Sequence, residues 1–204
     1  MGYVGIVDFK SNNSNSVLSV VVALGIEARL ITSEIEIFKA DRLIIPGVGH
    51  IDSIVNEMDE LGIRDSIISF VMSGKYLLGI CLGQHLLGSG SEESLSVSTL
   101  GILDFEVSRL PSNIDAGFRV PHVGWNSIIF DNAYPLFKSI PNGSDFYFSH
   151  SYAITTPTPN AMAVTEHSVP FTSVAGENNV FSVQFHPEKS QKVGRKLLHN
   201  FCEL

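Results

Sequence analysis

The first half of the chain alternates short apolar runs with segments of helical periodicity, and this alternation restricts the fold more than any other feature. The apolar runs predict strands at residues 3–7, 28–32, 43–45 and 76–80. The segments between them predict helices at residues 16–24, 52–61 and 64–72. Strands joined through helices run parallel in one sheet, and continuous apolarity suits strands that are buried on both faces. The first half therefore predicts an α/β fold with a parallel sheet.

Beyond residue 90 the pattern changes to short alternating strands separated by Pro, Gly, Asn and Ser. Strands are expected at residues 103–110, 127–130, 161–165 and 180–185, as antiparallel additions to the sheet. Ser190 is expected to cap a last helix at residues 191–202. A chain of 204 residues is close to the ~150-residue norm for one domain, so a single domain over residues 1–204 is expected.

Charge and hydropathy argue against several classes of protein. Thirteen basic against 21 acidic residues give a net charge of -8 without a basic cluster, so nucleic acid is not expected as a partner. The longest nearly apolar run, residues 17–26, is well short of the ~20 residues that cross a bilayer. The N-terminus lacks the features of a secretory signal, which favours a cytoplasmic location. Cys81 and Cys202 are too few for a disulfide framework and lack metal-ligand spacing, so no metal site is expected.

Cys81 lies between a predicted strand and a helical pattern, in the sequence Gly79-Ile80-Cys81-Leu82-Gly83. Small residues two positions before and after a nucleophile are typical of a sharp strand-to-helix turn that exposes the central side chain. At the start of a helix, the helix dipole and free N–H groups favour the thiolate over the thiol. The N–H of Leu82 would supply half of an oxyanion hole. The alternative is a buried packing cysteine.

His186 is the histidine best placed to carry a proton for Cys81. It follows the predicted strand at residues 180–185, and open α/β sheets place their sites at strand ends. Residues two apart share a side of an extended chain, so Glu188 is expected to accept a hydrogen bond from the imidazole and orient it. A solvated loop after an edge strand is the alternative. Residues 46–49, Pro-Gly-Val-Gly, end the third strand and could offer a second oxyanion N–H, although taken alone they are better explained as an ordinary glycine turn.

Six sequence blocks together resemble the class I, or triad, glutamine amidotransferases, whose signature is an apolar strand, Gly-x-Cys-x-Gly and a distant His-Pro-Glu. The blocks are Asp8 with Asn13 and residues 46–49, 79–83, 120–126, 147–152 and 183–190. Within that class the match narrows to the glutaminase subunits of imidazole glycerol phosphate synthase. Its most specific block is Pro-His-Val-Gly-Trp-Asn at residues 121–126. The blocks follow the family's order over nearly the whole chain.

The resemblance implies a flavodoxin-like three-layer α/β fold with a mainly parallel central sheet and added antiparallel strands. It also implies hydrolysis of L-glutamine to glutamate and ammonia, without a cofactor. The ammonia would pass to a cyclase subunit of (βα)8-barrel fold, which makes imidazole glycerol phosphate in histidine biosynthesis. The active form would then be a heterodimer.

Residue by residue, the resemblance implies that Cys81 is the nucleophile, His186 the acid and base, and Glu188 the group that orients it. The oxyanion would be held by backbone at Leu82, Gly47, Val48 and Gly49. Glutamine would be bound by Gly49, His85, His150, Ser151 and Tyr152. The cyclase would be faced by Asn13, Trp125, Asn126, Tyr147 and Lys189.

The chain departs from the family pattern at three positions. Lys10 and Asn12 stand where the first loop usually has glycines, and His85 stands where a glutamine usually helps to bind the substrate. The altered loop leaves open a paralogous glutaminase that supplies ammonia to a cyclase-like partner for sugar amidation in surface polysaccharide synthesis. A non-catalytic scaffold and a cysteine peptidase are the remaining alternatives.

Overall fold

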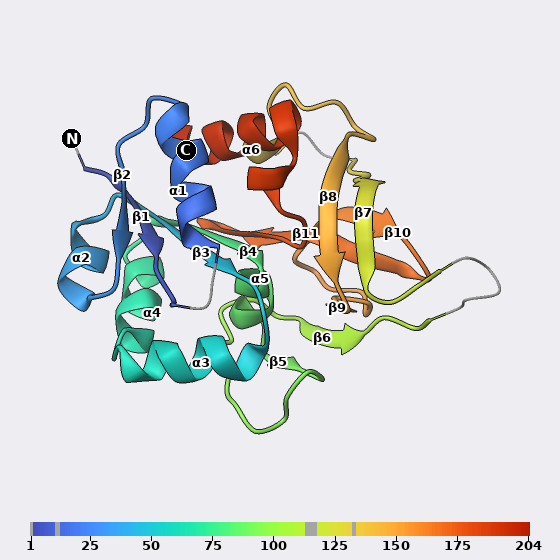
Figure 1. Ribbon diagram of the computed structural model, residues 1–204, viewed down its shortest axis with the longest axis horizontal. Helices are drawn as coiled ribbons and strands as arrows, with labels where there is room; N and C mark the ends of the chain where they lie inside the picture. The colour runs from blue at the N-terminus through green and yellow to red at the C-terminus, as the bar shows by residue number, and fades with distance from the viewer. Residues whose placement is uncertain (1, 11–12, 113–117, 132–133) are drawn as a thin grey trace.

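A seven-stranded sheet forms the centre of the computed structural model, which describes residues 2–10, 13–112, 118–131 and 134–204 (Figure 1). The strand order is β10-β11-β12-β4-β3-β1-β2. The strands β12, β4, β3, β1 and β2 pair in parallel, whereas β10 and β11 are antiparallel additions. Their bounds are Val4–Val7 (β1), Ala28–Ile31 (β2), Arg42–Gly47 (β3), Tyr76–Cys81 (β4), Ala161–Glu166 (β10), Pro170–Glu177 (β11) and Val180–Val183 (β12). The predicted mainly parallel sheet with antiparallel additions is confirmed.

Helices cover both faces of this sheet, which gives the predicted three layers (Figure 1). One face carries α1 (Ser14–Ala23) and α6 (Gln191–Glu203), whose apolar residues Val17, Val21, Leu197 and Phe201 belong to one core cluster. The other face carries α2 (Glu34–Lys39), α3 (Ile51–Glu60), α4 (Arg64–Met72) and α5 (Leu82–Leu87), which contribute to a second cluster. The sequence pattern missed α2, a helix of six residues.

The remaining strands lie beside the sheet and complete the end of the molecule that holds the site. β7 (His122–Ser127) and β8 (Asp145–His150) form an antiparallel hairpin. β5 (Gly90–Ser91), β6 (Glu106–Arg109) and β9 (Tyr152–Ala153) form a small three-stranded sheet. Short 3-10 turns lie at Pro135–Phe137 (η1) and Pro187–Lys189 (η2).

The strand predicted at residues 127–130 is wrong in position, because β7 ends at Ser127. Ile128 and Ile129 supplied the apolar signal. Ile128 is buried in the core, and Ile129 forms only an isolated bridge to Val164. The true strand carries Gly124 and Asn126, which are depleted in strands. Tertiary pairing with β8 therefore decides where this strand lies.

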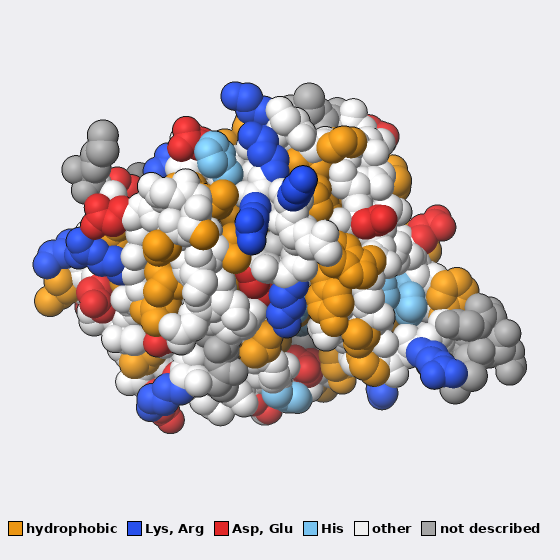
Figure 2. Space-filling view, turned by 45° about the horizontal axis from the view of Figure 1, so that its top comes forward, with side chains coloured by type: hydrophobic (Ala, Val, Ile, Leu, Met, Phe, Trp, Pro, Cys, Tyr) orange, Lys and Arg blue, Asp and Glu red, His pale blue; other side chains and the backbone are white. Residues whose placement is uncertain are grey.

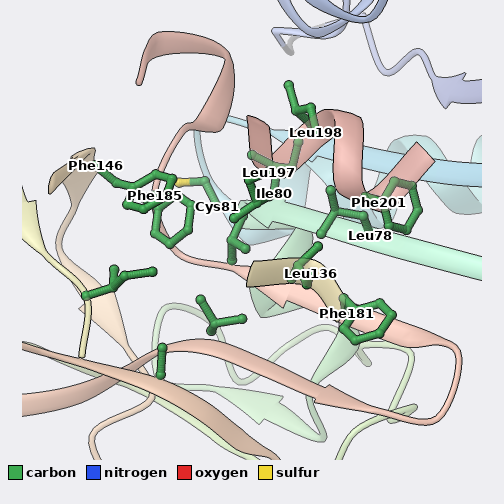
Figure 3. Packing of buried hydrophobic residues seen from close by; sticks show 14 of the residues in the cluster. Leu78, Ile80, Cys81, Leu136, Phe146, Phe181, Phe185, Leu197, Leu198 and Phe201 are labelled. Atoms are coloured by element: carbon green, nitrogen blue, oxygen red, sulfur yellow. The ribbon is translucent and has the colours of Figure 1, made fainter. Parts of the chain in front are cut away.

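Cys81 ends β4 close to the main apolar core (Figure 3). In that view Phe146 and Phe185 lie beside it, and Leu78 and Ile80 continue along the strand beneath α6. The rings of Phe146 and Phe185 are 4.1 Å apart between centroids. Among the described residues, no helix combines the length and apolarity that a bilayer span requires.

Candidate active site

The chain turns sharply at Cys81, where β4 passes directly into α5. Cys81 has φ 54° and ψ -108°, a backbone conformation that non-glycine residues rarely adopt outside functional sites. A Cβ at Gly79 would lie 2.6 Å from the carbonyl oxygen of Gly83, and one at Gly83 would lie 2.0 Å from that of Ile45. The turn therefore needs glycine on both sides of the cysteine, as the sequence predicted. At Gly83, the closest neighbour belongs to β3.

The sheet topology brings His186 to Cys81. β12 pairs in parallel with β4, with Val183 opposite Ile80, so the carboxyl ends of the two strands meet at one edge. His186 Nδ1 lies 2.8 Å from Glu188 Oε1, and both side chains are almost fully buried. The predicted contact is present, although its predicted reason is wrong. Glu188 lies in the 3-10 turn η2, and this turn brings the carboxylate back to the ring.

The charges around His186 favour its protonated form. Burial by itself lowers the pKa of His186. The charge and hydrogen bond of Cys81, together with the hydrogen bond and charge of Glu188, outweigh burial and raise the pKa to about 10. Since Nδ1 is used by Glu188, Nε2 is the ring nitrogen left for the sulfur. The three groups can therefore hold an imidazolium beside the sulfur of Cys81.

Glu188 is itself held by the first loop of the chain. Asn13 Nδ2 donates a 2.6 Å hydrogen bond to Glu188 Oε1, the same oxygen that His186 contacts. Asn13 was predicted to face a partner. The structure places its side chain against the buried carboxylate, and it is partly exposed. Lys10 lies in this loop and donates its backbone N–H to Glu57, whereas Asn12 lies outside the described residues.

The backbone of His186 is fastened to the hairpin. Its N–H donates to the carbonyl oxygen of Tyr147 in β8 over 2.8 Å. The Ser190 hydroxyl donates to the His186 carbonyl over 2.7 Å and accepts from the Tyr147 N–H over 2.9 Å. Ser190 occupies the N-cap position of α6, but its hydroxyl makes no capping hydrogen bond. The predicted side-chain cap is wrong because this hydroxyl joins η2 to β8.

A pocket of about 280 Å³ opens above Cys81. Most of the residues that the sequence predicted around the nucleophile line it. The lining consists of Val48, Gly49, Cys81, Leu82, His85, Glu93, Pro121, Ser149, His150, Ser151, Tyr152, His186 and Lys189. Gly47 packs behind the pocket, where an added Cβ would lie 2.7 Å from that of Leu82. Gly49 has a φ of +98°, which glycine adopts without strain.

His85 is buried at the pocket wall. Its Nε2 lies 2.9 Å from Gln184 Oε1, and its Nδ1 has no hydrogen-bond partner among the described residues. Burial lowers the pKa of His85 to about 4, against a smaller opposing effect of Gln184, so the ring is neutral at pH 7. The preceding residue, Gln84, donates to Ser182. The imidazole of His85, and not the amide of Gln84, therefore stands at the pocket.

His150 connects the pocket to the hairpin through a second histidine. Its Nδ1 lies 2.8 Å from the Tyr152 carbonyl and its Nε2 lies 2.9 Å from His122 Nδ1. A carbonyl only accepts, so His150 Nδ1 carries the proton and its Nε2 accepts from His122. Burial holds the pKa of His150 well below its usual value and lowers that of His122 to about 4. Asn126 lies 3.2 Å from His122 Nε2 and continues this chain of hydrogen bonds.

The pocket also holds a carboxylate that the sequence did not point to. Glu93 lines the pocket, and its Oε2 accepts the backbone N–H of Ile51 over 3.0 Å. Burial raises the pKa of Glu93 in spite of this hydrogen bond. Pro121, Ser149 and, behind His85, Gln184 were missed as well. A possible signal for Gln184 was its position two residues before His186.

The outer side of the hairpin exposes apolar surface. Trp125 is 48% exposed and meets the Tyr147 ring edge to face, with centroids 6.0 Å apart. Lys189 Nζ lies 5.9 Å from the centroid of the same ring. Figure 2 shows basic side chains gathered in a band across the middle of one face, with hydrophobic side chains next to them. Of the residues predicted to face a partner, Trp125, Tyr147 and Lys189 form one cluster.

In the part of the chain that the structure describes, no three or more His, Cys, Asp or Glu side chains are arranged to bind a metal ion. The groups gathered at the pocket are a thiol, imidazoles, carboxylates and backbone N–H groups. This set suits acyl transfer through a covalent thioester.

Comparison with known proteins agrees with this chemistry. The chain is 38% identical over 203 residues to the imidazole glycerol phosphate synthase subunit HisH of Buchnera aphidicola subsp. Acyrthosiphon pisum, covering 99% of this chain and all of the relative. It is 40% identical over 200 residues to the HisH subunit of Pectobacterium atrosepticum, covering 98% of each. A HisH 2 subunit of Methanococcus maripaludis is 38% identical.

Solved structures share the fold at lower identity. A crystal structure of a glutamine amidotransferase superposes with a TM-score of 0.77 at 21% identity, over 99% of this chain and 98% of the other. PurLQS from Thermotoga maritima gives 0.72 at 17% identity, over 100% and 99%. The family model described as "Glutamine amidotransferase class-I" matches residues 5–204. With its nearly full-length relatives and this match, the chain belongs to the class I glutamine amidotransferase family.

Proposed function

We propose that the chain is the glutaminase subunit of an imidazole glycerol phosphate synthase, which hydrolyses L-glutamine to glutamate and ammonia. The observation that carries the proposal is the placement of Cys81 on a strained turn, beside a buried His186 that Glu188 orients. Relatives that carry this name match the chain over nearly its full length. The same geometry disfavours a scaffold, because a binding surface has no need of a strained cysteine beside a buried ion pair.

In the proposed reaction, the Cys81 thiolate attacks the side-chain carbonyl carbon of glutamine. The carbon–nitrogen bond breaks as His186 Nε2 gives its proton to the departing nitrogen, which leaves as ammonia, and a thioester remains on Cys81. Water then gives a proton to His186 while its oxygen attacks the thioester carbon. Glutamate leaves, and the thiolate and imidazolium are restored. Glu188 keeps the Nε2 edge directed at the sulfur throughout.

The tetrahedral intermediate carries a negative oxygen that needs hydrogen-bond donors. The N–H of Leu82 follows the nucleophile at the start of α5, where the first N–H groups of a helix have no partner within the helix. Val48 and Gly49 line the opposite wall, and a rotation of the peptide between them would turn a second N–H into the pocket. Gly49 has a positive φ in this structure, and glycine adopts positive and negative φ equally readily, so it tolerates the large change in φ that this rotation causes.

Substrate recognition follows from the charges in the pocket. The Glu93 carboxylate is suited to the α-ammonium group of glutamine. Backbone N–H groups at Ser151 and Tyr152 are suited to the α-carboxylate, and His85, whose Nδ1 has no partner among the described residues, is suited to the side-chain amide. The pocket therefore offers partners to each polar group of a free amino acid.

The ammonia has to reach an acceptor site on a second subunit before it is protonated. In neutral water ammonia becomes ammonium, which has no lone pair for attack, so a sealed passage to the acceptor site keeps it reactive. A (βα)8-barrel cyclase is the partner we propose, with Trp125, Tyr147 and Lys189 on the docking side and Asn13 and Asn126 behind them. The sugar-amidation alternative differs only in the acceptor.

The chain should be co-expressed with a cognate cyclase in a histidine auxotroph and assayed as the purified complex. Growth and glutamine-dependent synthesis of imidazole glycerol phosphate are expected. Cys81→Ala should abolish synthesis from glutamine and leave synthesis from added ammonium chloride intact, because the cyclase site is untouched. Failure to grow with both proteins soluble rejects the histidine pathway. If a diazo-oxo glutamine analogue fails to label Cys81 even with the ligand-bound partner, the glutaminase itself is rejected.

A further inference from the structure

A second buried side chain besides His186, the amide of Gln184, lies against the sulfur of Cys81. Gln184 is fully buried, and its Nε2 lies 3.9 Å from Cys81 Sγ. This separation is within the reach of an N–H···S contact, because sulfur is a large, weak acceptor that becomes stronger as a thiolate. The other end of the amide, Oε1, lies 2.9 Å from His85 Nε2. The single side chain of Gln184 thus joins the imidazole of His85 to the sulfur.

The direction of the amide is set by His85. Burial keeps the imidazole neutral, so only one of its two nitrogens carries a proton. If Gln184 were reversed, its oxygen would face the sulfur, and His85 Nδ1 would have to hold a proton. That N–H would be buried with no acceptor among the described residues, which proteins avoid more strictly than an unused acceptor. The favoured arrangement has His85 Nε2–H donating to Gln184 and Gln184 Nε2–H donating to Cys81.

We propose that Gln184 is a positioning residue for the nucleophile: its amide holds the Cys81 thiolate by an N–H···S hydrogen bond, and His85 orients that amide. The inference rests on the proposed function only in taking Cys81 as the nucleophile. His85 stands where the family usually has glutamine, and the imidazole supplies through Nε2–H the donor that an amide would supply. Having histidine at residue 85 instead of glutamine therefore preserves the contact between Gln184 and the Cys81 sulfur.

The proposal is tested on the free chain through the rate at which iodoacetamide alkylates Cys81 between pH 5 and 10. Cys202→Ser is the parent for every variant, because Cys202 is the only other cysteine. Gln184→Met keeps the length of the side chain and removes the donor. We expect alkylation at pH 7 to fall roughly threefold to tenfold, the value of one hydrogen bond, with the limiting rate at high pH within about twofold of the parent.

Variants at His85 provide a second test that does not depend on how well Gln184→Met folds. His85→Leu removes the donor that orients the amide and is expected to move the pH profile in the same direction as Gln184→Met. His85→Gln keeps an N–H for Gln184 Oε1. Its rate of Cys81 alkylation is expected to stay within about twofold of the parent's rate at every pH. In the complex, Gln184→Met should lower kcat for glutamine and leave KM nearly unchanged.

Gln84→Met is the matched control, since Gln84 is an equally buried amide that donates to Ser182 and not to the sulfur. It should lower the thermal stability without moving the alkylation profile. A Gln184→Met profile that superimposes on the parent overturns the proposal. So does a Gln84→Met profile that moves as far as that of Gln184→Met. Alkylation needs neither glutamine nor a partner, so a parent without glutaminase activity would count against the proposed function alone.

Discussion

Glu93 is the one carboxylate among the described residues that line the pocket, and it leads to a prediction about binding. Glu93→Gln removes the negative charge and keeps an oxygen for the Ile51 N–H. A charge-assisted hydrogen bond is stronger than a neutral one, so losing the charge should weaken substrate binding. We expect Glu93→Gln to raise KM for glutamine about tenfold and to leave kcat within about twofold of the parent. Steady-state kinetics of the complex measure this split.

The neighbouring acid is the control for this measurement. Glu92 is exposed, accepts the Arg109 backbone N–H and is not among the pocket residues. Glu92→Gln should therefore leave both kinetic constants unchanged. Equal effects of the two substitutions, or a fall in kcat alone for Glu93→Gln, would show that Glu93 does not hold the substrate.

At this scale, the sequence could predict the residues whose spacing carries a mechanism. Two glycines around Cys81 specify a turn, and His186 with Glu188 follows a strand end. Glu93 carries no such signal, because an acid in a serine-rich loop has many uses and its approach to the pocket depends on the contact with Ile51. Gln184 is missed for a related reason: its role depends on His85, a residue about 100 positions away that only the fold brings near.

The turn between β4 and α5 is the element on which the site depends, and it should tolerate almost no added volume at Gly83. Gly83→Ala would place a methyl group 2.0 Å from the Ile45 carbonyl oxygen, a backbone atom that moves only with β3. We expect a loss of about 3 kcal/mol or more in the free energy of unfolding, measured by urea denaturation.

Gly90 provides the comparison for this change in volume. It lies in β5, and an added Cβ there would have no atom within 4 Å. Gly90→Ala should change the free energy of unfolding by no more than about 0.5 kcal/mol. If Gly83→Ala lowered the free energy of unfolding no more than Gly90→Ala, the close packing of α5 against β3 would be contradicted.

Apart from the six-residue helix α2, the elements of the first half were predictable because each of these strands and helices has a strong pattern of its own. The helix at Arg64–Met72 has the predicted bounds, and β4 extends one residue further than predicted. The second half resists prediction because its strands depend on partners. β8 and β11 were both missed: β8 pairs with β7, which itself lacks a strand-like pattern, and β11 pairs with β10 across a bulged register. Pairing of this kind leaves little local periodicity.

For the whole molecule, the buried neutral histidines predict a loss of stability in mild acid. The folded pKa is about 4 for His85 and His122 and well below 6.5 for His150, so each lies below its unfolded value. As the pH falls, the unfolded chain binds protons first and is stabilised. The contribution of these three histidines to stability is therefore full above about pH 6.5 and is lost progressively toward pH 4.

Thermal unfolding between pH 7 and 4.5 measures this effect. His85→Gln replaces one titrating group by a neutral one and should make the fall in Tm with pH less steep than in the parent. His50→Gln is the control, because His50 is exposed at the start of α3. Parallel curves for the parent and His85→Gln would contradict the assignment of the acid sensitivity to buried imidazole.

His186 follows a strand of the central sheet, but its backbone N–H and carbonyl are bonded to β8 and Ser190. The backbone of Cys81 is held instead within the central sheet, where β4 pairs with β3 and α5 packs closely against β3. The two reacting groups thus lie at the ends of neighbouring strands of one sheet, but His186 is in addition hydrogen-bonded to the hairpin. A displacement of the hairpin would carry the imidazole with it or break one of these hydrogen bonds, whereas the backbone of Cys81 is held by β3. A contact that pushes on the exposed face of Trp125 would therefore change the distance between the His186 ring and the Cys81 sulfur.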